Sequence, residues 1–270
     1  MTKILTNAQI EYYHHNGYLS PFNILNAAEV NYCLQSFETI ETQFGGAMNT
    51  HELRHKPHLI MGWADRLVHN PKILDLVEDL IGPDILCWES ALFIKPSQSE
   101  SYISWHQDLT YWGLDDSDIL TVWVALTPSI KESSCVRVIP GSHLGKVVPH
   151  KDTFAPKNML TRGQTIAVDF DETKAVGLEL QPGQISLHHV KLFHCSGANH
   201  SLNRRIGLAI RYMPTSVSQK LGNGDSSTLV RGEDRYGNFE LEKRPNGEFD
   251  TNALSYRKRL FEQRMNIVMN

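Results

Sequence analysis

The chain has 270 residues, which lies at the upper end of the range for one domain and is enough to bury a substantial core. Hydrophobic residues make up 41% and charged residues 21%, as in an ordinary globular protein, and a formal net charge of -4 excludes the basic excess typical of nucleic-acid-binding proteins. No stretch approaches the roughly 18 consecutive apolar residues of a membrane span, so we expect neither membrane insertion nor secretion.

Three helices are expected near the N-terminus, one from Asn7 to about Asn16, one from Ala27 to about Gln43, and one over residues 71–82. Asn7 and Asn26 are placed to cap the first two, because an asparagine at a helix start accepts hydrogen bonds from free backbone N–H groups. The third begins with Pro71 and ends with Gly82, as helices often do. Its apolar residues recur at helical spacing, so one face must cover another part of the protein.

Short β-strands are expected between Asp84 and Pro214, where apolar or alternating runs are separated by turn residues. Many short strands at this spacing favour an all-β sandwich or barrel over a parallel sheet with crossover helices. Residues 215–250 are rich in Gly, Asn, Asp and Ser, a composition that fits either a solvated loop or a lid. A last amphipathic helix is expected over about 252–268.

The four cysteines are far apart and include no CxxC pair that would suggest structural zinc or a redox dithiol; they are Cys33, Cys87, Cys135 and Cys195. This usage fits a reducing compartment, and we expect a cytoplasmic protein. The sequence does not distinguish a monomer from a homo-oligomer.

The motif His106-Gln107-Asp108 ends one predicted strand, in the aromatic stretch S-W-H-Q-D-L-T-Y-W-G-L. Residues two apart on a strand project from the same face, so the imidazole and the carboxylate would lie side by side as two metal ligands. Taken alone, such a pair often occurs by chance and could form a plain hydrogen bond.

A third ligand is available at His194, which ends an apolar run just before a small-residue turn. Two histidines and one carboxylate on one face leave three positions of an octahedral ion open for a bidentate 2-oxo acid and O2, as in non-haem Fe(II) oxygenases.

His188 and His189 compete with His194 for the role of third ligand. They alternate faces, so one should point inward, and a satisfied core or pocket histidine is the alternative interpretation for each. His143, in P-G-S-H, is expected to lie in a loop.

Arg205 opens a predicted strand soon after His194. A guanidinium binds a carboxylate through two hydrogen bonds and stays charged when buried, which suits the distal carboxylate of 2-oxoglutarate. Ser196 could add a hydroxyl. Without His194, the pair Arg204-Arg205 would be interpreted as surface charge.

With these residues identified, the chain resembles the phytanoyl-CoA dioxygenase family of Fe(II)/2-oxoglutarate-dependent oxygenases. Similar stretches occur in the same order over about residues 8–220, namely W-H-Q-D-L-T-Y-W-G-L, T-V-W-V-A-L-T-P, V-R-V-I-P-G-S-H, L-Q-P-G-Q-I-S-L-H-H and H-C-S-G-A-N, followed by R-I-G-L-A-I-R-Y-M-P. The resemblance implies a mainly β fold with flanking α-helices, built on a double-stranded β-helix (jelly-roll) core. It also implies one domain over residues 1–270, with N-terminal helices over about 7–82, a core over about 84–214, a loop or lid over about 215–250 and a final helix.

The resemblance also assigns roles at matching positions. The family's iron ligands correspond to His106, Asp108 and His194, and its 2-oxoglutarate site corresponds to Arg205, Ser196 and Trp123. The implied cofactors are Fe(II), 2-oxoglutarate and O2, and the implied reaction hydroxylates a C–H bond and releases succinate and CO2. Family halogenases replace the carboxylate ligand with a small residue, so Asp108 indicates hydroxylation or a related oxidation. Lys95 matches a frequent family residue of open role, with surface exposure as an alternative.

Seven side chains near these motifs are candidates for substrate contact: Tyr111, Trp112, Arg54, His58, His189, Asn199 and Arg211. The basic members suit a small polar or anionic metabolite or a natural-product intermediate, although residues 54–58 could also form a solvated loop.

Two other functional classes share parts of this pattern. A zinc-dependent cupin-like hydrolase or isomerase could use two histidines and an aspartate, and a non-catalytic jelly-roll protein could simply bind a ligand. Arg205 argues against the first, because a hydrolase has no need of a dicarboxylate there. The open metal positions argue against the second.

Overall fold

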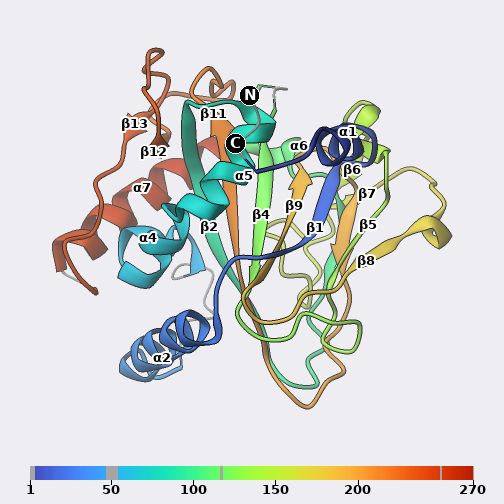
Figure 1. Ribbon diagram of the computed structural model, residues 1–270, viewed down its shortest axis with the longest axis horizontal. Helices are drawn as coiled ribbons and strands as arrows, with labels where there is room; N and C mark the ends of the chain where they lie inside the picture. Colours follow the sequence, from blue (N-terminus) through green and yellow to red (C-terminus); the bar gives the residue numbers. More distant parts are fainter. Residues whose placement is uncertain (1–3, 47–53, 116–117, 250, 270) are drawn as a thin grey trace.

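The computed structural model describes residues 4–46, 54–115, 118–249 and 251–269, and its main feature is a pair of β-sheets with helices on one side (Figure 1). The elements, in chain order, are α1 (Asn7–Asn16), β1 (Tyr18–Asn23), α2 (Ala27–Gln43), η2 (Pro57–Leu59), α4 (Gly62–Val68), α5 (Pro71–Ile81), β2 (Ile85–Lys95), β3 (Ile103–His106), α6 (Leu109–Trp112), β4 (Leu120–Ala125), β5 (Val136–Val138), η3 (Ser142–Leu144), β6 (His150–Lys151), β7 (Thr165–Ile166), η4 (Glu172–Lys174), β8 (Val176–Leu178), β9 (Gln184–His189), β10 (His194–Ser196), β11 (Arg205–Pro214), β12 (Ser226–Arg231), β13 (Glu240–Leu241) and α7 (Thr251–Met269).

The larger sheet has seven strands in the order β1-β9-β4-β11-β2-β12-β13, and the smaller has four in the order β3-β10-β5-β8. Neighbouring strands are antiparallel in both sheets, except for the parallel pair β12 and β13. A two-stranded sheet of β6 and β7 completes the β structure of the described residues. The mainly β jelly roll with flanking helices that the sequence predicted is therefore confirmed.

The period-two alternation of β11 divides the interior into two layers. Ile206, Leu208, Ile210 and Tyr212 belong to the hydrophobic core on the helix side of the large sheet. The alternate residues Arg205, Gly207, Ala209 and Arg211 point the other way, toward the smaller sheet. All eight are buried. One strand thus contributes to the core with one face and to a polar cavity with the other.

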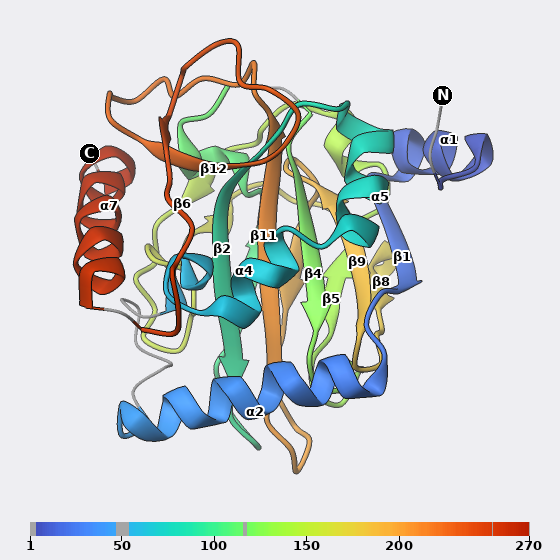
Figure 2. The ribbon, with the colours of Figure 1, turned by 60° about the vertical axis from the view of Figure 1, so that its left-hand side comes forward.

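Helices cover the outer face of the large sheet, where α4 and α5 cross in front of β2, β11 and β4 (Figure 2). Apolar residues of α5 are buried in the helix-side core, so this helix covers the sheet as its stripe predicted. The caps explain why the helices begin where they do: Asn26 and Glu29 form a capping box at the start of α2. For α1 the cap is Thr6 rather than the predicted Asn7, because Thr6 accepts from the Gln9 N–H and completes the box.

The segment expected to be a loop or lid contributes strands to the large sheet. β12 pairs with β2, and β13 pairs with β12. Helix α7 is joined to these strands by buried ion pairs, because its Arg264 donates to Asp225 just before β12 and to Glu89 on β2. Lys56 and Glu242 form a second buried pair nearby. These partners are distant in sequence, so local composition could not predict them.

No helix in the described parts of the chain is long and apolar enough to span a membrane. The four cysteines are all buried and free.

Gly207 provides a test of how closely the sheet packs on its cavity side. A Cβ at this position would lie 2.2 Å from the Trp123 ring, so Gly207→Ala must displace the indole or the strand. We expect the substitution to lower the free energy of unfolding by about 1–3 kcal/mol in urea denaturation, as overpacking usually does. A Cβ at Gly247 would have no neighbour within 4 Å, so Gly247→Ala is the matched control. Equal effects of the two substitutions would contradict the packing argument.

Candidate active site

Three potential metal ligands meet between the two sheets. His106 ends β3, His194 begins β10, and the two are directly opposite each other in the antiparallel ladder. The ligand atoms of His106, Asp108 and His194 all lie within 4.8 Å of one another, and all three residues are buried. Asp108 Oδ1 is 3.4 Å from His106 Nε2 and 3.9 Å from His194 Nε2. Two imidazoles and one carboxylate therefore converge on a common point.

Asp108 reaches this point by a different route from the one predicted. Strand β3 ends at His106, and Asp108 has helical backbone angles (φ -60, ψ -41) as the residue before α6. The histidine and the aspartate thus converge across a strand-to-helix turn and do not share a strand face. Thr121 donates a hydrogen bond of 3.2 Å to Asp108 Oδ2, which leaves Oδ1 facing the histidines.

The backbone fixes the tautomer of both histidines. Nδ1 of His106 lies 2.9 Å from the Ser104 carbonyl, and Nδ1 of His194 lies 2.9 Å from the Leu192 carbonyl. A carbonyl oxygen only accepts, so each Nδ1 carries the proton and each Nε2 presents its lone pair toward Asp108. Without a cation these lone pairs and the carboxylate would face one another unfavourably.

The charge states also suit a metal. Burial, together with the neighbouring His106, holds the pKa of His194 well below its usual value, so this imidazole is neutral. Burial alone would raise the pKa of Asp108, but His194, His106 and Arg211 outweigh it and hold that pKa well below the usual range. A neutral imidazole and an ionised carboxylate are the forms that bind metal ions.

Arg205 lies in the same cavity, which we call the inner chamber and which His106, Asp108, His194 and Arg205 line together. Its Nη1 donates to the Ser134 carbonyl and to Ser196 Oγ, the latter at 2.9 Å. Its Nε and Nη2 are buried without a hydrogen-bond partner among the described residues. Burial lowers the pKa of Arg205 to about 10, so the group remains charged. A buried guanidinium with free donors requires an anion, and a carboxylate of 2-oxoglutarate fits that requirement.

Two other predicted cosubstrate residues adjoin Arg205. The Trp123 ring centroid is 5.0 Å from the guanidinium, and its indole Nε1 is buried without a partner. Ser196 Oγ lies between Arg205 and Lys95, with Lys95 Nζ at 2.7 Å. Lys95 is fully buried, so the surface-exposed alternative is wrong. Burial and the adjacent Arg205 lower the pKa of Lys95 to about 6.

Of the two competing histidines on β9, His188 is the one that faces the inner chamber. Its ring centroid is 4.7 Å from that of His194, and neither of its nitrogens has a partner among the described residues. Burial lowers the pKa of His188 to about 4, so the ring is neutral. His188 is therefore a neutral polar side chain that lies beside the candidate metal ligand His194.

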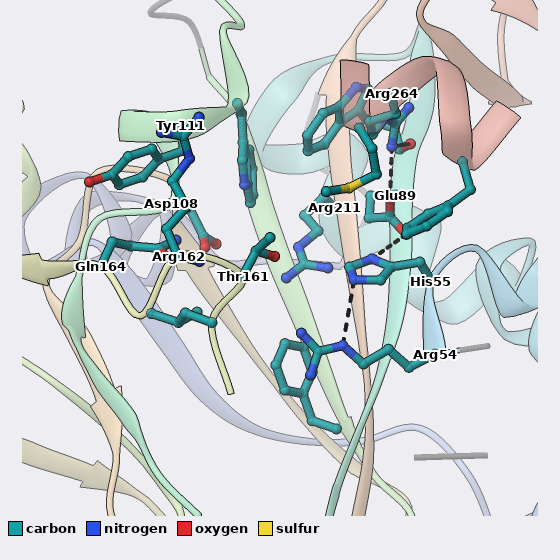
Figure 3. A pocket seen from close by; sticks show the side chains of 16 residues that line it. Arg54, His55, Glu89, Asp108, Tyr111, Thr161, Arg162, Gln164, Arg211 and Arg264 are labelled. Atoms are coloured by element: carbon teal, nitrogen blue, oxygen red, sulfur yellow. Dashed lines mark hydrogen bonds and ion pairs between the residues drawn. The ribbon is translucent and has the colours of Figure 1, made fainter. Parts of the chain in front are cut away.

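A second cavity, which we call the outer chamber, opens on the other side of Asp108 (Figure 3). Phe93, Asp108, Leu160 and Arg211 line both chambers, so the candidate metal position lies at their junction. Four of the predicted substrate contacts line the outer chamber: Tyr111, Trp112, Arg54 and Arg211.

The other three predicted substrate contacts lie outside both chambers, and each is satisfied by protein groups. His58 is enclosed by Ser90, Thr228 and Glu242. His189 faces away from the cavity, near Tyr13 and His143.

Asn199 donates to the carbonyls of Lys95, Pro96 and Asn203 and so holds its own loop. The structure therefore does not bring these three residues together with the other predicted substrate contacts.

Sequence reasoning missed much of the outer-chamber wall. Phe261, Arg264 and Met265 come from α7, and Trp88 comes from β2. The amphipathic pattern of α7 indicates only that one face is buried, so no sequence signal connects it with the metal-binding motifs.

Comparison with known proteins agrees with this geometry. A sequence model of the phytanoyl-CoA dioxygenase family matches residues 13–207. A probable alpha-ketoglutarate-dependent hypophosphite dioxygenase from Stutzerimonas stutzeri is 29% identical over 242 residues, covering 82% of this chain and 84% of that protein. The human peroxisomal phytanoyl-CoA dioxygenase is 28% identical over 237 residues, covering 77% of this chain and 68% of that protein.

Solved structures extend the comparison to three dimensions. The non-heme monooxygenase ThoJ in its apo form superimposes with a TM-score of 0.85 at 38% identity, covering 96% of this chain and 97% of that one. CytC3 with Fe(II) and alpha-ketoglutarate shares the fold, with a TM-score of 0.67 at 21% identity. The match covers 91% of this chain and 97% of that one.

Metal binding can be tested apart from catalysis. We expect His194→Ala to weaken Fe(II) or Ni(II) binding in anaerobic equilibrium dialysis by at least about a hundredfold, since even loss of a residue that orients a ligand costs 10–100-fold. His189→Ala removes a neighbouring imidazole that faces away from the site and should retain wild-type metal affinity. Equal losses in the two variants would refute the assignment of His194.

Proposed function

Because the chain belongs to the phytanoyl-CoA dioxygenase family of Fe(II)/2-oxoglutarate-dependent oxygenases, we propose that it hydroxylates a C–H bond of a small molecule and releases succinate and CO2. His106, Asp108 and His194 would hold Fe(II), and Arg205 with Ser196 and Trp123 would hold 2-oxoglutarate. The observation that carries this proposal is the convergence of three ligand atoms beside a buried guanidinium with unpartnered donors.

The protein's own residues have defined tasks in this reaction. Fe(II) and 2-oxoglutarate, when bound with O2, supply the oxidising power through oxidative decarboxylation. The Ser104 and Leu192 carbonyls keep both Nε2 atoms available, and Thr121 keeps Asp108 Oδ1 turned inward. Apolar and aromatic side chains of the inner chamber, including Phe93, exclude water from the reacting centre.

The substrate would enter the outer chamber, where Tyr111, Trp112, Arg54 and Arg211 provide aromatic and cationic contacts. We infer a small polar or anionic molecule; a relative named for action on hypophosphite, an inorganic anion, supports this inference. Asp108 favours hydroxylation over halogenation, because it occupies the position that a halide needs. The whole chain would act as one domain, since α7 contributes to the chamber wall.

The alternative of a zinc hydrolase or isomerase leaves Arg205 unexplained, because such a reaction requires no carboxylate there. A purely binding jelly roll would not need a three-ligand site with open positions. Both alternatives predict no 2-oxoglutarate turnover.

The proposal is tested by adding Fe(II) and 2-oxoglutarate anaerobically and recording the weak visible charge-transfer band of the chelate. Succinate release is then screened against polar and anionic metabolites, and products are analysed by mass spectrometry. A substrate that stimulates succinate formation and gains one oxygen supports hydroxylation. Absence of the band in the wild-type protein would refute the oxygenase proposal.

Arg205 has a matched control in its neighbour in the chain. We expect Arg205→Gln to raise the 2-oxoglutarate concentration for half-maximal turnover by at least about tenfold, because it removes a buried charge-assisted hydrogen-bonding group. Arg204 lies in surface ion pairs with Glu38 and Glu41, so Arg204→Gln should stay within about twofold of wild type. An unchanged 2-oxoglutarate requirement in Arg205→Gln would contradict its assigned role.

A further inference from the structure

We propose that Arg54 and Arg211 form an oxyanion clamp in the outer chamber, and that the substrate therefore carries a carboxylate or phosphonate-type group. This inference rests on the proposed function, because it specifies the substrate class for the same active site.

Arg211 reaches the chamber from the strand that also supplies Arg205. The two residues are six positions apart on β11, so they share a face and their Cα atoms are separated by about 20 Å. Gly207 and Ala209 lie between them, and the absence of a side chain at Gly207 leaves room for the Trp123 ring. One strand thus presents one guanidinium to the inner chamber and another to the junction with the outer chamber.

Arg54 approaches Arg211 from the segment before η2. Both guanidinium groups lie over the Phe93 ring, at 5.4 Å for Arg54 and 5.8 Å for Arg211, and both point into the chamber (Figure 3). The two side chains are only 7% and 9% exposed. Burial and the like charge of Arg211 lower the pKa of Arg54 to about 10, so it stays protonated near neutral pH.

These two arginines differ from the other arginines of the chamber wall. Arg162 is paired with Asp152, and Arg264 with Glu89 and Asp225. Arg54 and Arg211 form no ion pair with a carboxylate of the described residues, and Arg54 donates only to the Met159 carbonyl at 2.7 Å and to His55 at 3.5 Å. Arg211 Nε is buried without a partner.

The nearby carboxylates are already engaged. Glu89 accepts from Arg264 and from the Lys56 backbone. Asp108 belongs to the metal site, where its charge and those of 2-oxoglutarate are balanced by Fe(II) and Arg205. Two adjacent buried cations then remain uncompensated, which is costly unless a ligand supplies the counter-charge. An oxyanion with two or three oxygens can bridge both guanidinium groups.

The other side chains that line the outer chamber indicate what kind of molecule carries the anionic group. Trp88, Trp112 and Phe261 line the same chamber, and Trp88 and Trp112 pack with ring centroids 4.8 Å apart. An apolar or flat body would pack against these rings while its oxyanion binds the arginines.

The test compares three probes that share a benzyl group: phenylacetate, benzylphosphonate and uncharged phenylacetamide. Binding to the full chain, loaded anaerobically with Fe(II) and 2-oxoglutarate, is measured by calorimetry. We expect at least one anion to bind at least about tenfold more tightly than the amide, and Arg54→Gln and Arg211→Gln each to weaken anion binding about tenfold or more. Amide binding should change less than about threefold.

Arg162→Gln is the matched control, because Arg162 lines the same chamber but is neutralised by Asp152. A preference for phenylacetate assigns a carboxylate substrate, and a preference for benzylphosphonate assigns a phosphonate-type substrate. Equal binding of amide and anions, no anion binding, or equal losses in all three variants would overturn the clamp. The anion-to-amide ratio in the wild-type protein tests the clamp even if a variant misfolds.

The charge-transfer band distinguishes this proposal from the proposed function. A band without anion preference overturns only the clamp. Anion preference in the same mixture with Fe(II) and 2-oxoglutarate, but without a band, overturns only the oxygenase reaction.

Discussion

The active site depends on one register: His106 on β3 opposite His194 on β10. Directly opposed residues of an antiparallel pair project from the same face, so this pairing brings together two imidazoles that are far apart in sequence. A one-residue slip would turn one of them away. Each ring is then fixed by the carbonyl two residues earlier in the chain, Ser104 for one and Leu192 for the other. The same strand ladder thus sets both the position and the tautomer of the ligands.

The two chambers that meet at Asp108 differ in their electrostatics. The inner chamber combines the ligand set with Arg205, whose free donors match one carboxylate. The outer chamber contains Arg54 and Arg211, which form no ion pair with a carboxylate of the described residues. Because β11 supplies an arginine to each chamber, the small residues Gly207 and Ala209 between them are part of the site: they leave room for Trp123 and for bound molecules.

Sequence patterns predicted the parts of this arrangement that local chemistry determines. The jelly roll, the Asn26 cap of α2, the Pro71 and Gly82 ends of α5 and the covering role of α5 follow from periodicity and end residues. The ligand set was predicted because His106 and Asp108 are two residues apart and His194 ends an apolar run just before a small-residue turn. Other residues depend on long-range contacts: alternation showed that one of His188 and His189 faces inward, but only the pairing of β9 with β1 and β4 determines which. The position of His58 outside both chambers could not be predicted either, because its partner Glu242 is 184 residues away.

The end of the family match lies between two groups of residues in the site. The match ends at residue 207, after the metal ligands and Arg205 but before Arg211 and the α7 residues that line the outer chamber. Arg264 on α7 donates to Glu89 on β2 and to Asp225 just before β12, so α7 is held in place by buried ion pairs. The outer chamber therefore combines residues inside the matched region, such as Arg54, Tyr111 and Trp112, with Arg211 and the α7 residues that follow it.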